Sequence, residues 1–173
     1  MKKVVEKLKS LNKTIATMES CTGGGVANAI TNIPGSSDVL KFSAVTYSNE
    51  YKIKMGVSKE TIDKYSVYSM EVAKEMSKAI SDFAESDIGV GVTGKMGVLD
   101  PANPYGDDNT IYISIYFKDD DKYYTYTMHT KYESRKDNKE LIISKIEEEL
   151  IKILWYNLYR GVIWKNINQK KNS

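Results

Sequence analysis

The sequence predicts a three-layer α/β/α fold whose mixed sheet includes an antiparallel hairpin. Helical and strand patterns alternate along the chain, which is typical of α/β architecture. The segments 110–118 (TIYISIYFK) and 122–130 (KYYTYTMHT) flank an acidic turn and predict the hairpin. With 173 residues, 41% of them hydrophobic and 28% charged, the chain can form one domain with its own core.

Four elements are expected in the first part of the chain. A first helix is indicated by the helical spacing of four apolar residues, Val4, Val5, Leu8 and Leu11. A strand is expected over 14–18, a second helix over 25–32 and another strand over 40–47. The second helix should stop before Pro34 and Gly35, because proline cannot continue a helix.

A helix-rich stretch follows, in which Ser58 and Ser69 are expected to be N-caps. After Ser69, one helix face should be buried through Val72, Met76, Ile80 and Phe83. Residues 87–93 (DIGVGVT) predict a buried strand in which two glycines let a neighbouring backbone come close. A long final helix is expected from about Asp137 to Tyr159.

Charge and composition limit the classes of function. The net charge of +2 is too small to indicate a dedicated nucleic-acid-binding protein. No apolar run approaches the ~20 residues of a membrane span, and the single cysteine cannot form an internal disulfide. We therefore expect a cytoplasmic protein with one domain over 1–160 and a basic tail over 161–173, without membrane or nucleic-acid partners.

Aromatic and basic residues mix near the C-terminus, where residues 151–173 hold five cations and no acid. The aromatic members are Trp155, Tyr156, Tyr159 and Trp164. They could form a binding strip for a nucleic acid or a membrane surface. Alternatively, they pack on the domain or on a second subunit and leave the lysines in water.

A hydroxyl-rich turn follows the first expected strand, in the stretch TIATMESCTGGG. Three glycines after Thr22 let backbone N–H groups approach an anion, and a helix start adds a favourable partial charge. Ser20 or Cys21 would then lie beside an electrophile. A structural alternative is a tight strand-to-helix turn in which Ser20 and Thr22 cap the helix. The segment is not a Walker A loop, because no GKS or GKT follows the glycines.

A second segment, YSNEYK, contributes Tyr47 and Lys52. A serine hydroxyl needs a base, and a lysine buried beside a tyrosine can have its pKa lowered enough to serve as one. The single histidine, His129, falls on the hairpin and gives little support to a Ser-His-Asp triad. With one histidine and one cysteine, no metal site and no cofactor are expected.

Several motifs together resemble the nicotinamide-nucleotide amidase family, also known as the C-terminal domain of the competence/damage-inducible protein CinA. They are ESCTGG, the NIPGSS turn, VTYSNEYK, MGVSKETIDKY, SVYSMEVAKEMSKAI and GVTG. The similarity covers about residues 4 to 155, and the chain resembles the stand-alone form of the family. It implies hydrolysis of nicotinamide mononucleotide to nicotinate mononucleotide and ammonia, in pyridine-nucleotide salvage. It also implies a homodimer or higher homo-oligomer.

The resemblance also implies roles for individual residues. The nucleophile falls on Ser20, and Lys52 would take and return the proton with assistance from Tyr47. Donors for the substrate phosphate or the oxyanion fall on Thr22, Gly23, Gly24, Thr93 and Gly94. Arg135 would contact the phosphate, or it is a surface charge at the start of a helix.

Two segments depart from the family pattern. In the family a glycine-rich loop usually follows the pair Thr93-Gly94, but here residues 95–109 have a different sequence. Lys139 stands where the family usually has a second arginine. These changes leave two alternatives open. One is an amidohydrolase of the same mechanism that acts on a different small amide, and the other is a non-catalytic nucleotide-binding homologue.

Overall fold

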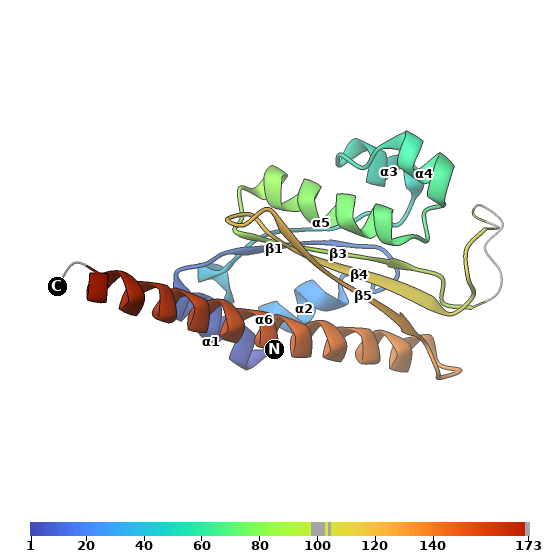
Figure 1. Ribbon diagram of the computed structural model, residues 1–173. Helices are drawn as coiled ribbons and strands as arrows, with labels where there is room; N and C mark the ends of the chain where they lie inside the picture. The colour runs from blue at the N-terminus through green and yellow to red at the C-terminus, as the bar shows by residue number, and fades with distance from the viewer. Residues whose placement is uncertain (98–102, 104, 172–173) are drawn as a thin grey trace.

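The computed structural model describes residues 1–97, 103 and 105–171, with side chains up to 156. Its centre is a five-stranded sheet in the order β2-β1-β3-β4-β5. The parallel strands are β1 (Ile15–Glu19), β2 (Leu40–Val45) and β3 (Ile88–Gly94). The antiparallel part is the hairpin of β4 (Thr110–Phe117) and β5 (Lys122–His129). The expected mixed sheet is confirmed (Figure 1).

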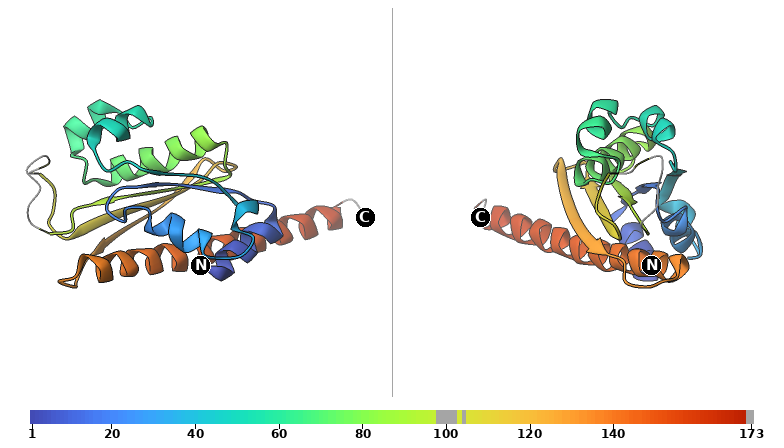
Figure 2. Two further views of the ribbon diagram at one scale, coloured as in Figure 1. Left: turned by 180° about the vertical axis from the view of Figure 1, so that it is seen from behind. Right: turned by 90° about the vertical axis from the view of Figure 1, so that its right-hand side faces the viewer.

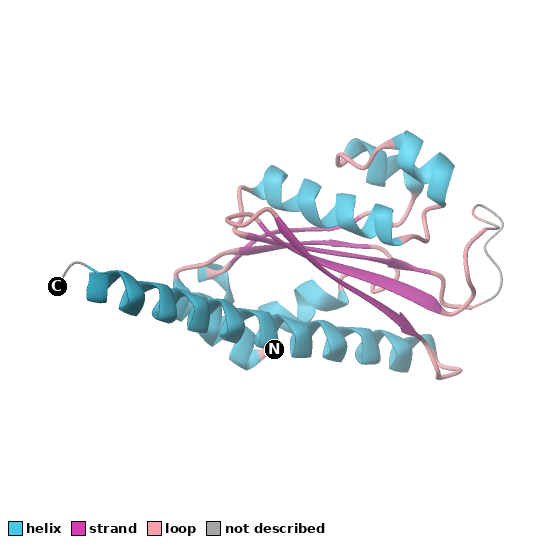
Figure 3. Cartoon of the chain, in the orientation of Figure 1, coloured by secondary structure: helices cyan, strands magenta, loops and turns pink. Residues whose placement is uncertain are grey.

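Helices cover both faces of this sheet (Figures 1 and 3). On one face lie α1 (Lys2–Leu11), α2 (Gly25–Thr31) and α6 (Arg135–Lys171). The other face carries α5 (Met70–Ala84), with α3 (Asn49–Lys54) and α4 (Lys59–Tyr65) on the same side. A short 3-10 turn, Ser36–Asp38, precedes β2. The end-on view shows the three layers, so the predicted α/β/α arrangement is also confirmed (Figure 2).

The two faces of the sheet bury separate apolar clusters. The larger cluster lies under α1, α2 and α6, and its strand members include Ile15, Val90 and Ile113. The smaller one lies between the sheet and α5, with Met18 and Met76 among its members. Alternate residues of each strand point to opposite faces, which is why adjacent β1 residues such as Ile15 and Ala16 belong to different clusters.

Close contact between α5 and β3 depends on the two strand glycines. A Cβ atom on Gly89 would lie 1.8 Å from the Ser77 carbonyl oxygen, and one on Gly91 would lie 2.3 Å from the Ala73 carbonyl oxygen. The expected approach of a neighbouring backbone is therefore confirmed. The expected caps are also present, since Ser58 Oγ accepts from the Thr61 amide and Ser69 Oγ accepts from the Val72 amide.

Two expectations about the helices are wrong. Phe83 is 63% exposed and contacts the Phe42 ring, with 5.1 Å between the ring centroids. The helix passes there over β2, the edge strand, and no further strand lies beyond it to bury the ring. The last helix does not end at Tyr159 but continues through Lys171 into the expected tail. A single glycine there costs a helix only about 1 kcal/mol, and no proline interrupts the run.

The C-terminal aromatic residues are only partly within the described side chains. Trp155 and Tyr156 are about half exposed, and the Lys7 ammonium lies 3.9 Å from the centroid of the Trp155 ring. The side chains of Tyr159 and Trp164 lie outside the described residues. Across the part of the chain that the structure describes, no helix is long and apolar enough to cross a membrane.

The contact between β3 and α5 leads to a stability prediction. Gly89→Ala should lower the free energy of unfolding by roughly 3 kcal/mol, because the new methyl group meets a helix backbone that cannot move alone. Gly25→Ala is the matched control, because its methyl group meets the flexible end of Ile143. The control should change stability by about 1 kcal/mol or less. Denaturant unfolding measures both, and equal effects would contradict this packing.

Candidate active site

The end of β1 and the turn that follows it are held on both sides by backbone hydrogen bonds to other segments of the same chain. The Ser20 amide donates to the Val92 carbonyl at 3.0 Å, and the Thr46 amide donates to the Glu19 carbonyl at 2.8 Å. Since β1 is parallel to β2 and β3, the carboxyl ends of all three strands meet at one edge of the sheet, where ligands of α/β proteins commonly bind. The sheet therefore sets the position of Ser20.

Lys52 reaches Ser20 from helix α3. A hydrogen bond of 3.1 Å joins Lys52 Nζ to Ser20 Oγ, and Nζ also donates to the Thr46 carbonyl at 2.7 Å. Ser20 is 6% exposed and Lys52 is 1% exposed. Helix α3 begins a few residues after β2, with Ser48 as its cap. The structure thus brings together the predicted nucleophile and the predicted base.

Tyr47 lies apart from this hydrogen bond. Its side chain is 65% exposed, and its hydroxyl accepts from Arg135 Nη2 at 3.5 Å. Arg135 Nη1 donates to the Met96 carbonyl at 2.6 Å. The first residue of α6 therefore links the segments that follow β2 and β3. Tyr47 and Arg135 form a pair at the rim of the Ser20 turn.

The carboxylate of Glu19 occupies the start of helix α2. It accepts from the Val26 amide at 3.0 Å, from the Ala27 amide at 2.8 Å and from Thr22 Oγ1 at 2.7 Å. The helix start, which the sequence suggested as a site for an external anion, is thus filled by the chain's own side chain. Glu19 was not among the residues predicted from the sequence, although an acid a few residues before a helix with unsatisfied amides is a recognisable signal.

The glycines of the turn differ in what remains available to a ligand. The Gly23 amide donates to the Ser20 carbonyl at 3.1 Å. The Gly24 amide donates to no acceptor in the part of the chain that the structure describes. Both residues have positive φ angles, 62° and 90°, which favour glycine. Gly24 is therefore the turn glycine whose amide could donate to a ligand.

Thr93 and Gly94, at the end of β3, contact protein rather than open space. Thr93 is fully buried, and its Oγ1 donates to the Val67 carbonyl at 3.0 Å. A Cβ atom on Gly94 would lie 2.6 Å from the Thr110 carbonyl oxygen. The hydroxyl hydrogen of Thr93 is thus directed to the connection between α4 and α5, and Gly94 allows β4 to come close.

Two cations of α6 face the glycine turn. Arg135 contacts Met96 and Tyr47, and one helical turn later Lys139 extends toward Gly23. A Cβ atom on Gly23 would lie 3.2 Å from Lys139 Nζ. Lys139, which stands at the second arginine position of the family, therefore still places a positive charge at the turn. Its ammonium group replaces the planar guanidinium group of arginine.

Cys21, the rival nucleophile, is buried beside Ser20. Burial raises the pKa of its thiol to about 12. The thiolate is the nucleophilic form of cysteine, and this thiol stays protonated at neutral pH. The environment of Cys21 is that of a small packing residue, which favours Ser20 as the attacking group.

Two polar contacts involve the segment after β3, one within the segment and one to α3. Lys95 is buried and its Nζ lies 2.7 Å from Asp108 Oδ1. Asn49 Nδ2 donates to Asn103 Oδ1 at 2.7 Å. Residues 98–102 and 104 lie outside the described residues. The replaced segment is therefore attached to α3, the helix that carries Lys52.

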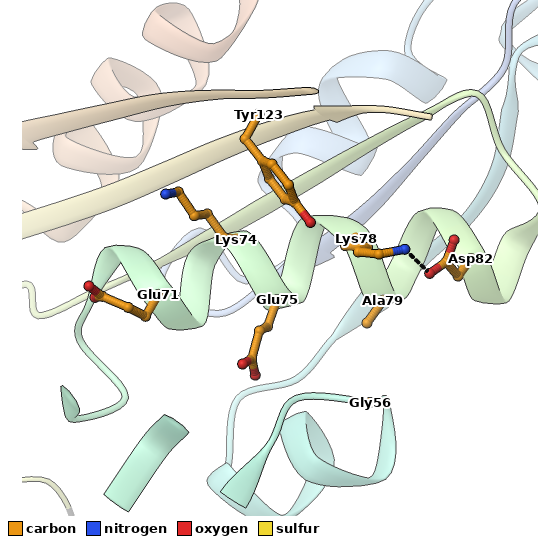
Figure 4. A pocket seen from close by; sticks show the side chains of 8 residues that line it. All are labelled: Gly56, Glu71, Lys74, Glu75, Lys78, Ala79, Asp82 and Tyr123. Atoms are coloured by element: carbon orange, nitrogen blue, oxygen red, sulfur yellow. Dashed lines mark hydrogen bonds and ion pairs between the residues drawn. The ribbon is translucent and has the colours of Figure 1, made fainter. Parts of the chain in front are cut away.

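A separate depression of about 550 Å³ lies on the outer side of α5. Figure 4 shows its charged side chains along the helix, including the ion pair of Lys78 and Asp82. Glu75 accepts from the Ser58 amide and from Thr61 Oγ1. None of the residues that line this depression belongs to the Ser20 turn.

Among the described residues, no group of three His, Cys, Asp or Glu side chains could hold a metal ion.

Comparison with known proteins places this chain in a family. The family model of the CinA C-terminal domain matches residues 1–154. The chain belongs to the CinA C-terminal domain family. Two solved structures described as CinA superfamily or competence/damage-inducible proteins share its fold. The protein from Klebsiella pneumoniae has a TM-score of 0.80 and 24% identity over 90% of this chain and 95% of its own. That from Enterobacter asburiae has the same score and identity over 88% and 94%.

Curated relatives carry the name "Putative competence-damage inducible protein". The protein of Clostridium kluyveri is 44% identical over 104 residues, which is 60% of this chain and 25% of the relative. The protein of Clostridium perfringens is 51% identical over 85 residues, which is 49% of this chain and 21% of the relative. The chain thus covers about a quarter of the length of these curated relatives.

The environment of Cys21 leads to a prediction about labelling. The native protein should react very slowly with iodoacetamide at pH 8, because the thiol is buried and its pKa is raised. The same protein unfolded in guanidinium chloride should be labelled at one site, which mass spectrometry counts. Equal labelling rates for native and unfolded protein would contradict the buried, protonated thiol.

Proposed function

We propose that this CinA-family chain is an amidohydrolase that converts nicotinamide mononucleotide to nicotinate mononucleotide and ammonia. The observation that carries the proposal is the buried 3.1 Å hydrogen bond between Ser20 Oγ and Lys52 Nζ. Amide hydrolysis needs an activated nucleophile and an acid for the leaving amine, and a serine–lysine pair can supply both. The choice of substrate rests on the resemblance of ESCTGG and YSNEYK to the nicotinamide-nucleotide amidases.

The first chemical step uses Lys52 as a base. Removal from water disfavours the charged form of a lysine. A neutral amine has two hydrogens and one lone pair. One hydrogen donates to the Thr46 carbonyl, and in the proposed step the lone pair accepts the proton of Ser20. As Ser20 Oγ bonds to the carboxamide carbon, its proton passes to Nζ, and the carbonyl oxygen becomes the oxyanion.

The remaining steps return the proton. The ammonium group of Lys52 protonates the departing nitrogen, the C–N bond breaks, and ammonia leaves an ester on Ser20. Water then attacks this ester with Lys52 again as base, which releases the carboxylate and restores the serine. We assign the Gly24 amide to the oxyanion, because it lies four residues from Ser20 and has no protein acceptor within the described chain.

The substrate phosphate is assigned to the cations of α6. Arg135 and Lys139 lie at the rim of the turn, whereas the start of α2 is closed by the Glu19 carboxylate. A guanidinium group favours phosphate through paired, charge-assisted hydrogen bonds. Tyr47, hydrogen-bonded to Arg135, would then assist by orienting the nucleotide at the rim. Thr22 and Thr93 would support the turn and the end of β3 through their hydrogen bonds to protein.

Removal of either member of the pair should abolish turnover. Ser20→Ala and Lys52→Met should each reduce ammonia release from nicotinamide mononucleotide at least about 1,000-fold, because the members of such a unit act together. Circular dichroism must show that both variants are folded. Cys21→Ala is the matched control at the adjacent position and should retain most of the activity. Full activity in Ser20→Ala would refute the assignment, and release only from other amides would retain the mechanism but not the substrate.

Removal of the rim arginine should affect binding rather than chemistry. Arg135→Gln should raise KM for nicotinamide mononucleotide about 10- to 100-fold with little change in kcat, because a charge-assisted hydrogen bond contributes about 1.5–3 kcal/mol. Nicotinamide riboside, which lacks the phosphate, is the control substrate, and its kcat/KM should be unchanged. An equal loss with both substrates would indicate that Arg135 acts only through Met96 and Tyr47.

A further inference from the structure

Glu19 is a buried carboxylate next to the nucleophile that the proposed reaction does not use. It is fully buried, and its two oxygens receive four hydrogen bonds from the chain. Oε2 accepts from Thr22 Oγ1 and the Val26 amide, and Oε1 accepts from the Ala27 amide and, at 3.3 Å, from Thr17 Oγ1. A buried charge is expensive unless it is paired or hydrogen-bonded, so these four donors explain why a carboxylate is tolerated there.

The hydrogen bonds of Glu19 close the turn that carries Ser20. The carboxylate joins the end of β1 to Thr22 within the turn and to the first residues of α2 beyond it. The intervening residues therefore cannot move independently of either element. The amides at a helix start also carry a partial positive charge that favours an anionic partner.

The main chain of Glu19 also acts on the base. Its carbonyl accepts from the Thr46 amide at 2.8 Å, and the Thr46 carbonyl accepts from Lys52 Nζ at 2.7 Å. Through its side chain Glu19 fixes the turn of the nucleophile, and through its backbone it fixes the residue that orients the lysine. A misplacement of about 1 Å between reacting groups can reduce a rate about 100-fold, so the position of this residue matters for catalysis.

We propose that Glu19 is a positioning residue that sets the Ser20–Lys52 geometry through its carboxylate. This inference rests on the proposed function, because it requires Ser20 to be a nucleophile. Both oxygens of Glu19 are hydrogen-bonded within the protein, so we assign it no contact with the substrate. Its carboxylate also directs an anionic substrate away from the start of α2 and toward Arg135 and Lys139.

The test measures the reactivity of Ser20 without the natural substrate. A fluorophosphonate probe forms a bond from Ser20 Oγ to phosphorus while the P–F bond breaks, fluoride leaves and the serine proton passes to Lys52. Intact-mass spectrometry follows labelling over time at several probe concentrations. This separates the maximal labelling rate from the concentration that gives half of it. Thermal unfolding of each variant defines a temperature at which all are folded.

Glu19→Gln is the principal variant, because it keeps the length of the side chain but places an NH₂ group against a backbone N–H group. Its maximal labelling rate should fall at least about tenfold, with the half-saturating concentration unchanged. Glu19→Asp keeps the charge but withdraws it by one methylene group from the helix amides. The rate should fall in this variant too, which keeps the test valid if the glutamine variant does not fold.

A matched control separates positioning from general destabilisation. Ser77 is fully buried on the opposite face, where its Oγ lies 2.8 Å from Ser114 Oγ. Ser77→Ala should lower the unfolding temperature and leave the labelling rate unchanged. Labelling of a folded Glu19 variant at the wild-type rate, or an equal loss of rate in Ser77→Ala, would overturn the role of Glu19 but not the assignment of Ser20 as the nucleophile. A wild-type protein that the probe does not label at Ser20 would overturn the proposed nucleophile and this inference together.

Discussion

The parallel pairing of β1 with both β2 and β3 is the constraint on which the candidate site depends. It places the carboxyl ends of three strands at one edge of the sheet, and the backbone pairing continues one residue beyond β1, at Ser20 and Thr46. The serine is therefore held by the sheet and not by a loop alone. Helix α3 starts a few residues after β2, and its Lys52 side chain reaches back to the same edge. On the other face of the sheet, α5 packs closely on Gly89 and Gly91 of β3.

The charged groups around the turn have different surroundings and therefore different chemistry. Lys52 is buried with a carbonyl and a hydroxyl as partners, while Glu19 is buried with amides and hydroxyls. Arg135 lies at the rim and can meet a ligand from outside. Cys21 is buried, which raises the pKa of its thiol to about 12. The proposed reaction thus assigns proton transfer, support of the turn and anion binding to different neighbouring side chains.

Much of the fold could be predicted because its signals are local. Serine caps, strand glycines and a hairpin with an acidic turn each depend on a few adjacent residues, and the structure confirms them. The predicted burial of Phe83 was wrong because helical spacing predicts a helix face but not where the sheet beneath it ends. The predicted end of the last helix was wrong because its last residues contain a glycine but no proline to stop the helix.

The candidate site was predictable in composition but not in geometry. The motifs and the resemblance pointed to Ser20 and Lys52, which the structure brings into contact. They gave no sign that Tyr47 pairs with Arg135 or that Thr93 donates to a backbone carbonyl, since neither the motifs nor the resemblance connects these residues to each other. An acid before a glycine turn and a helix was a signal for Glu19, but the sequence did not show that the turn folds back and brings its carboxylate to the amides of Val26 and Ala27.

The proposed reaction depends on acylation of Ser20 with the help of Lys52. Rapid-quench intact-mass spectrometry during turnover of nicotinamide mononucleotide can detect this acyl-enzyme. We expect an adduct equal to the substrate mass less ammonia, located by peptide mapping on Ser20 and absent in Lys52→Met. An adduct on Cys21, or turnover that persists in Ser20→Ala, would refute the role of Ser20.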